Sequence, residues 1–180
     1  PNGIRCHFEL ARYQYRHRQT EGLHASVYTL ARIYPAIYSH LRKESFWSPE
    51  TQTAARKGLA QAVKEHTMPD TALRNLSSIA AEHGNWDKAL FHYRRGLAAS
   101  KRKIKATEFF HLGRLYLKTG QRSEAEFTFF KGLDISPVRD RYVTRLVRLY
   151  QNEGAEALLG LYEQFNSRYR FSIESEMAFI

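Results

Sequence analysis

One spacing pattern occurs twice in this chain and constrains its fold more than any other feature. Each residue of the first copy has a counterpart at the same offset in the second, and the pairs are Leu76 and Leu112, Ala80 and Tyr116, Gly84 and Gly120, Ala89 and Ala125, Tyr93 and Phe129, and Gly96 and Gly132. A repeat of this size is typical of proteins in which each unit stacks on its neighbours. Stacked units form an extended surface rather than a catalytic pocket, so the pattern predicts a binding function.

The second copy is interpreted as two helices joined by a tight turn. Apolar residues recur first at the spacing of one helix face, and these are Phe109, Leu112, Tyr116 and Leu117. Gly120 predicts the end of this helix, because glycine adopts the left-handed backbone of a C-terminal cap. A second helix is expected from Ser123 until Pro137 stops it, and its inner residues are Ala125, Phe129 and Leu133.

Small residues predict a close approach of the two helices. Gly113 and Ala125 are expected to face each other, where a larger side chain would hold the helices apart. The first copy is interpreted in the same way over residues 72–100, with Gly84 as the turn and Asn85 opening the second helix.

These residues resemble the tetratricopeptide repeat (TPR), whose pattern is a Leu-Gly pair, a Tyr one turn on, then Gly, Ala, an aromatic, Ala and Pro. The second copy departs from this pattern only at Gly132, where Ala is usual, and the first departs at Ser77, Ala80 and Lys101. The resemblance covers roughly residues 70–165, about half of the chain. It implies an all-α fold: a superhelical array of antiparallel helix hairpins.

A degenerate third copy follows, and the residues that keep its spacing are Leu146, Tyr150 and Gly154. Leu159 replaces the small residue of its second helix. The TPR-like repeats are assigned to residues 70–167. Residues 168–180 are expected to form a capping helix or a loose tail, and their apolar side chains could dock on another copy of the chain.

Three further helices are expected ahead of the repeats, within residues 1–69. The first spans roughly residues 4–18, and the second spans residues 22–43 with a kink at Pro35. The third begins at Ser48, which has a proline and a glutamate directly after it, as is typical of a helix start. These helices form either a divergent repeat or a separate cap, and both alternatives stay open.

The sequence lacks the features of a membrane or disulfide-bonded protein. No apolar run approaches the ~20 residues needed to cross a bilayer. No signal peptide is expected, because Pro1 to Arg5 lack an apolar stretch. Cys6 is the only cysteine, so an internal disulfide is excluded, and a small buried side chain is its expected role. The chain is interpreted as a soluble segment, and the cytoplasm and the periplasm both stay open.

No catalytic or metal-binding motif is present. The phosphate-binding loops GxxxxGK[ST] and GxGxxG are absent, as are HExxH and the GxSxG nucleophile turn. The histidines are scattered and do not pair at ligand spacing with a nearby carboxylate; they are His7, His17, His24, His40, His66, His83, His92 and His111. We therefore expect no enzyme activity, no catalytic residue, no metal and no cofactor.

The positive charge of the chain points to an anionic partner. Lys and Arg number 28 against 18 Asp and Glu, a formal charge of +10, which attracts anions without specifying which. In TPR arrays the first helix of each hairpin lines the concave groove. The resemblance therefore predicts a groove with these binding residues: Arg74, Ser78, His111, Arg114, Lys118, Arg141, Arg145 and Arg148.

One TPR subfamily offers a precedent, because it clamps the terminal carboxylate of a chaperone peptide with Lys, Asn, Asn, Lys and Arg. At the matching positions this chain has Arg74, Ser78, His111, Arg141 and Arg145. The charge is kept at three of these positions and both asparagines are replaced, so we predict an anionic ligand but not that peptide. The alternative is a solvated face whose arginines pair with Glu82, Asp140 or a neighbouring molecule.

Two further basic clusters are less specific. Residues 101–105 contain three lysines and an arginine and are interpreted as a solvated loop, although such a run can touch phosphates or lipid headgroups. Residues 13–18 alternate tyrosines with bases, as single-strand nucleic-acid binders do. Core tyrosines with surface arginines explain this second cluster equally well.

The leading hypothesis is a non-catalytic protein-interaction scaffold whose arginine-rich groove binds an acidic or carboxylate-bearing segment of a protein or peptide. The first alternative is an extramembrane domain of a bacterial envelope machine, such as one for polysaccharide assembly, export or secretion, that contacts anionic glycan, a membrane surface or a partner subunit. RNA binding ranks behind both, because base stacking needs exposed aromatic side chains and Phe110 is the one expected in the groove.

Overall fold

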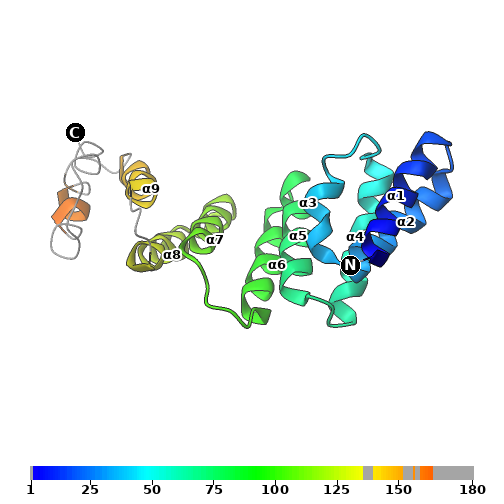
Figure 1. Cartoon of the computed structure of the whole chain (residues 1–180). Helices are drawn as coiled ribbons and strands as arrows, with labels where there is room; N and C mark the ends of the chain where they lie inside the picture. The colour runs from blue at the N-terminus through cyan, green and yellow to red at the C-terminus, as the bar shows by residue number, and fades with distance from the viewer. Residues whose placement is uncertain (1, 136–139, 152–155, 157–158, 164–180) are drawn as a thin grey trace. The chain divides into compact units, whose positions relative to one another are not determined.

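The computed structural model describes residues 2–135, 140–151, 156 and 159–163, and every regular element within these residues is a helix (Figure 1). In chain order they are α1 (Asn2–Arg16), α2 (Thr20–Ile33), the 3-10 helix η1 (Pro35–Ile37), α3 (Tyr38–Leu41), α4 (Pro49–Lys64), α5 (Pro69–Glu82), α6 (Trp86–Ala99), α7 (Ala106–Lys118), α8 (Arg122–Ile135) and α9 (Asp140–Tyr150). The predicted all-α fold class is confirmed. Pro137, Gly154 and residues 168–180, on which parts of the sequence interpretation depend, lie outside the described residues.

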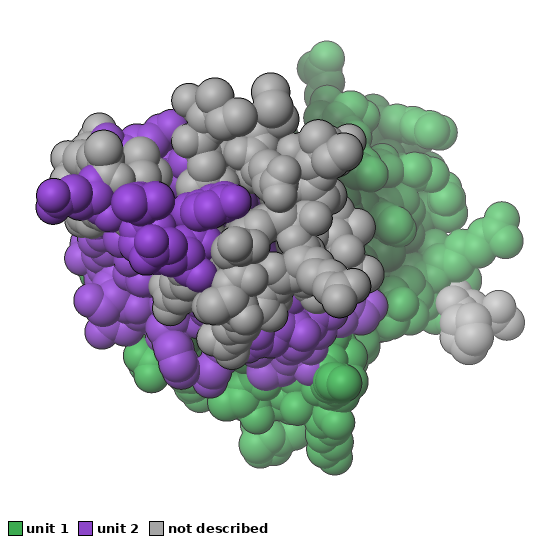
Figure 2. All heavy atoms as spheres, turned by 90° about the vertical axis from the view of Figure 1, so that its left-hand side faces the viewer, with its two compact units in different colours: residues 1–103 green, residues 104–180 purple. Residues whose placement is uncertain are grey.

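The chain divides into two compact units (Figure 2). Unit 1 is residues 1–103 and contains α1 to α6, and unit 2 is residues 104–180 and contains α7 to α9. The boundary expected at residue 69 lies inside unit 1, because α4 and α5 pack against each other across it. The basic cluster at residues 101–105 lies in the helix-free connection between α6 and α7.

Both clear repeats fold into helix hairpins, α5 against α6 and α7 against α8. Their turns lie at Gly84 and Gly120, whose φ angles of 71° and 74° confirm the predicted left-handed caps. Asn85 caps α6 as predicted, since its Oδ1 accepts a hydrogen bond from the Lys88 N–H at 3.4 Å. The hairpin pattern of the sequence is therefore present in both units.

Gly113 allows α7 to pack directly on Phe129, a core side chain of unit 2. A Cβ atom at this position would lie 2.5 Å from Cε1 of Phe129, a distance that real Cβ contacts do not show. Phe129 is fully buried, and so is Ala125 one turn before it. The requirement for a small residue at position 113 is confirmed, and the nearest atoms belong to the Phe129 ring rather than to Ala125.

The prediction of one kinked helix over residues 22–43 is wrong. α2 ends at Ile33, and Tyr34 has an extended backbone (φ −144°), the conformation that a proline imposes on the residue before it. The chain then turns through η1 and α3 before α4 begins. We call residues 34–48 the insertion, because α2 and α4 on either side of it pack together as a hairpin, as α5 and α6 do.

The insertion is anchored in the core of unit 1. Tyr38 is buried, and its ring meets the Trp47 ring edge-on at a centroid distance of 5.6 Å. Nδ2 of Asn75 in α5 donates a hydrogen bond to the Pro35 carbonyl at 2.7 Å. The ring contact therefore joins two parts of the insertion, and the insertion packs on α2 and on α5.

The first helix buries one face against this core. Ile4 and Phe8 pack against the core cluster, and Ala11 is fully buried within it. Cys6 lies elsewhere on the helix and is exposed, so the expectation of a buried cysteine is wrong. The 3.6-residue period explains this, because Cys6 lies about 200° around the helix from Ile4.

Candidate binding surfaces

The two predicted groove residues of unit 1 lie on α5 and do not form a free cationic site. Nη2 of Arg74 pairs with Oδ2 of Asp70 at 2.5 Å, one turn earlier on the same helix. Ser78 is exposed. The insertion also contacts this helix, because Nη2 of Arg42 lies 2.9 Å from Oε1 of Glu82. Arg74 and Arg42 are therefore each paired with a carboxylate of α5.

The predicted residues of α7 form an exposed basic row. His111, Arg114 and Lys118 are all exposed, and their spacings of three and four residues place them on one helix face. Glu108 is the single carboxylate of α7, and it is buried. Its Oε2 accepts a hydrogen bond from the Lys105 N–H at 2.8 Å, so it caps the helix and leaves the exposed face of α7 without an acid.

α9 brings further arginines to α7. Its residues Val143, Leu146 and Val147 are buried, which turns Arg148 to solvent. The guanidinium carbon of Arg145 lies over the Phe110 ring of α7, 6.0 Å from the ring centroid. The helices therefore meet at this pair. The side chain of Arg141, the third predicted arginine of α9, lies outside the described residues.

Aromatic side chains of α7 and α9 also contact α8. The Phe110 ring lies 5.9 Å from the ring of buried Phe129 in α8. At the C-terminal end of α9, the Tyr150 hydroxyl hydrogen-bonds to Glu126 of α8, and the Arg122 guanidinium lies 5.4 Å from the Tyr150 ring centroid. α9 is thus held on the α7–α8 hairpin by contacts at its middle and at its C-terminal end.

We call His111, Arg114, Lys118, Arg145 and Arg148 the α7–α9 basic surface. Arg114 and Arg148 are exposed, and no carboxylate of the described residues pairs with either. Like charges three or four residues apart destabilise a helix by about 0.2–0.5 kcal/mol per pair. A bound anion would relieve this repulsion, and guanidinium groups can hold a carboxylate with two parallel hydrogen bonds.

No protein-family model and no curated protein matches the chain. Among solved structures, the crystal structure of MamA, a protein that contains TPRs, is similar with a TM-score of 0.57 and 17% sequence identity, over 94% of this chain and 97% of that chain. The chain has a TPR-like helical-repeat fold. Within unit 2, α7 is the first helix of the α7–α8 hairpin, and α9 follows that hairpin.

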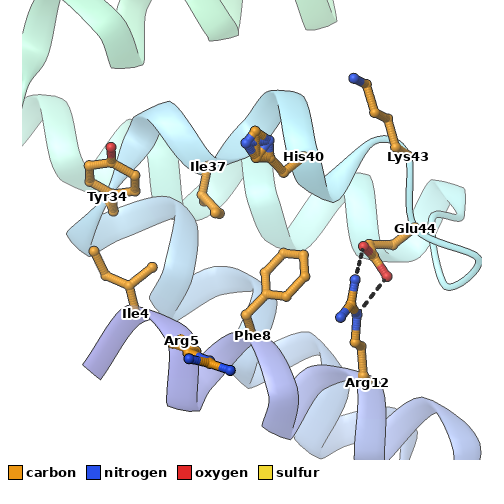
Figure 3. Close-up of a pocket in the computed structure, with 9 residues that line it drawn as sticks. All are labelled: Ile4, Arg5, Phe8, Arg12, Tyr34, Ile37, His40, Lys43 and Glu44. Carbon is orange, nitrogen blue, oxygen red and sulfur yellow. Dashed lines mark hydrogen bonds and ion pairs between the residues drawn. The ribbon is translucent and has the colours of Figure 1, made fainter. Parts of the chain in front are cut away.

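Unit 1 contains a hollow surface that the sequence analysis missed. It lies in unit 1 between α1 and the insertion, and one end of it is closed by Arg12 and Glu44 (Figure 3). Nε and Nη2 of Arg12 donate hydrogen bonds to the two carboxylate oxygens of Glu44 at 3.0 and 2.7 Å. The hydrogen bonds from Arg12 hold the pKa of the Glu44 carboxyl below its usual range.

This lowered pKa predicts how the stability of unit 1 changes with pH. A carboxyl whose pKa is lower in the folded state contributes stability above its unfolded pKa, and this contribution is lost as pH falls through the folded pKa. We expect Glu44→Gln to lower the free energy of unfolding by about 1 kcal/mol at pH 7, the upper end for a partly exposed ion pair. The difference from the unsubstituted chain should shrink below pH 4.5, the ordinary value for this carboxyl.

Urea denaturation of both chains from pH 7 down to pH 3 measures this difference. The control is the same comparison in an Arg12→Gln background, where the partner of Glu44 is absent. A difference that does not shrink between pH 4.5 and pH 3, or that survives in the Arg12→Gln background, would show that the ion pair is not its source.

Two other site classes receive no support from the part of the chain that the structure describes. No three His, Cys, Asp or Glu side chains there lie close enough together to hold a metal ion. None of the helices within those residues combines the length and the apolar character that a bilayer crossing requires.

Proposed function

We propose that this chain is a non-catalytic protein-interaction scaffold whose α7–α9 basic surface binds an acidic or carboxylate-bearing segment of a partner protein. The observation that carries the proposal is the position of the Arg145 guanidinium over the Phe110 ring. It brings one arginine of α9 next to the helix that carries the exposed basic row. The similarity to MamA supports the scaffold part of the proposal, since both share the TPR-like fold.

The charges of this surface suit an acidic peptide. Its arginines lie on two neighbouring helices, and the one carboxylate of α7 is buried. An extended segment that crosses both helices can therefore place successive carboxylates near cations from each. Arginine also retains its charge at any physiological pH and binds carboxylates through two N–H groups.

RNA fits this surface less well. Single-strand binders stack bases on exposed aromatic rings. Phe110 is half-buried, and the Arg145 guanidinium covers it. The aromatic side chain expected for base stacking is thus already occupied by an arginine. Anionic glycan and lipid headgroups remain outcomes of the experiment below.

Charge reversal of two exposed arginines tests the proposal. The variant is Arg114→Glu with Arg148→Glu, one residue on each helix. Because both side chains are exposed, we expect helical content to be unchanged and the free energy of unfolding to change by less than about 0.5 kcal/mol per site. Proteins captured from a nuclease-treated native lysate should fall by about tenfold or more relative to the unsubstituted chain, measured by quantitative mass spectrometry.

The matched control is Arg94→Glu with Arg95→Glu on α6 of unit 1, where both side chains are also exposed. It changes the net charge equally, and it should retain the captured proteins. Equal losses with both variants would show that net charge alone attracts the partners. Unchanged capture with the first variant would move the binding site elsewhere, and capture of glycan or lipid in place of protein would favour the envelope hypothesis.

A further inference from the structure

The groove between α1 and the insertion has an apolar floor. Its volume is about 670 Å³. Ile4 and Phe8 point into it from α1, and Ile37 faces them from the insertion (Figure 3). All three side chains are half-buried, so they pack against the core beneath and still present apolar surface to solvent.

Two sets of contacts hold the walls of this groove in place. The Arg12–Glu44 ion pair bridges α1 and the insertion at one end. The opposite side of the insertion is fixed to α5 by the hydrogen bond between Asn75 and the Pro35 carbonyl. The groove is therefore formed before any partner arrives, which lowers the entropic cost of binding.

Basic side chains lie on both walls of the groove. Arg5 is contributed by α1, and His40 and Lys43 by the insertion (Figure 3). All three are exposed, and no carboxylate of the described residues is paired with Arg5 or Lys43. Glu44 is the one carboxylate that lines the groove, and Arg12 already binds both of its oxygens. The rim therefore carries positive charge that nothing in the lining balances.

We propose that this groove is a docking site for an acidic amphipathic helix of a partner protein. Such a helix presents an apolar stripe flanked on both sides by carboxylates, which matches an apolar floor between two cationic walls. A fatty acid or lysolipid carries its charge at one end, so it would leave the cation of one wall unmatched. The site lies in unit 1 and is distinct from the α7–α9 basic surface of unit 2.

Subtractive peptide selection tests this proposal with the full chain. A phage-displayed library of random 16-residue peptides is first depleted on the Arg5→Glu/Lys43→Glu variant and then selected on the unsubstituted chain. This order removes peptides that bind any other surface, including the α7–α9 basic surface. We expect the survivors to carry apolar residues three or four positions apart with Asp or Glu beside them.

Fluorescence anisotropy of a surviving peptide then measures how it binds. The Arg5→Glu/Lys43→Glu variant should weaken its affinity by about tenfold or more, as should replacement of the peptide's acids by their amides. Lys57→Glu/Lys64→Glu on α4 is the matched control, because it makes the same charge change at two exposed residues outside the groove. This control and Arg114→Glu/Arg148→Glu should each leave the affinity within about twofold.

Three results would overturn the proposal. The first is that no peptide survives the depletion. The second is that the survivors lack acids or bind the amide peptide equally well. The third is that sodium dodecanoate binds in a manner that depends on Arg5 and Lys43 while peptides do not, which would make the groove a lipid site. Because the Arg114→Glu/Arg148→Glu variant is tested separately, failure here leaves the proposed function of unit 2 unaffected.

Discussion

Truncation of Phe129 to alanine is expected to lower the free energy of unfolding of unit 2 by about 3–5 kcal/mol. Phe129 is fully buried, and its ring fills the space against α7 that Gly113 leaves open. The substitution removes this apolar surface and leaves a cavity beneath Phe110, whose ring lies 5.9 Å away. Since Phe110 supports Arg145, the loss should also loosen α9.

Urea denaturation followed by far-UV circular dichroism measures this effect. Both tryptophans, Trp47 and Trp86, lie in unit 1, so tryptophan fluorescence reports on unit 1 instead. Phe127→Ala is the matched control, because Phe127 is 61% exposed on the same helix and contacts the Lys131 ammonium. It should cost at most about 1 kcal/mol. Equal losses from the two substitutions would contradict the packing described for α7 and α8.

The second large effect on stability is expected from Gly58→Ala in α4, a substitution that adds a single methyl group. A Cβ atom at position 58 would lie 2.3 Å from the carbonyl oxygen of Tyr28 in α2. A backbone atom cannot rotate away as a side chain can, so α2 and α4 must separate. We expect a loss of about 1–3 kcal/mol in the free energy of unfolding of unit 1, the usual range for overpacking.

Tryptophan fluorescence during urea denaturation reports this loss, because Trp47 packs against Tyr38 within the same unit. The control is Gly3→Ala in α1, where a Cβ atom would meet nothing within 4 Å. Alanine is the better helix former by about 1 kcal/mol, so this control should leave stability unchanged or raise it. A stabilising Gly58→Ala would mean that α2 and α4 are farther apart than described.

The repeat spacing predicted the hairpins well, because the residues that define a TPR-like unit act locally. Gly84 and Gly120 end helices through their own backbone angles. Helical periodicity likewise placed His111, Arg114 and Lys118 on one exposed face. Local geometry of this kind does not depend on which segments meet in space.

Contacts between residues far apart in the sequence could not be predicted from spacing and periodicity. The solvated-face alternative named Glu82 as a partner for the arginines of the predicted groove, and Glu82 instead pairs with Arg42 of the insertion. Arg74 pairs with Asp70, which the spacing of four residues could have suggested. The groove of unit 1 joins α1 to residues 34–48 through contacts that no repeat or motif signals.

The sequence alone determined the helical repeat, its turns and the excess of positive charge. Apolar spacing and glycine act within one or two helical turns, and net charge is a sum over the residues of the chain. Only the tertiary structure decided which of the arginines pair with a carboxylate. Carboxylates neutralise Arg74 and Arg12, whereas Arg114 and Arg148 of unit 2 have no acid beside them within the described residues. The physical reason is that the energy of an ion pair depends on the distance between its charges, and folding sets that distance.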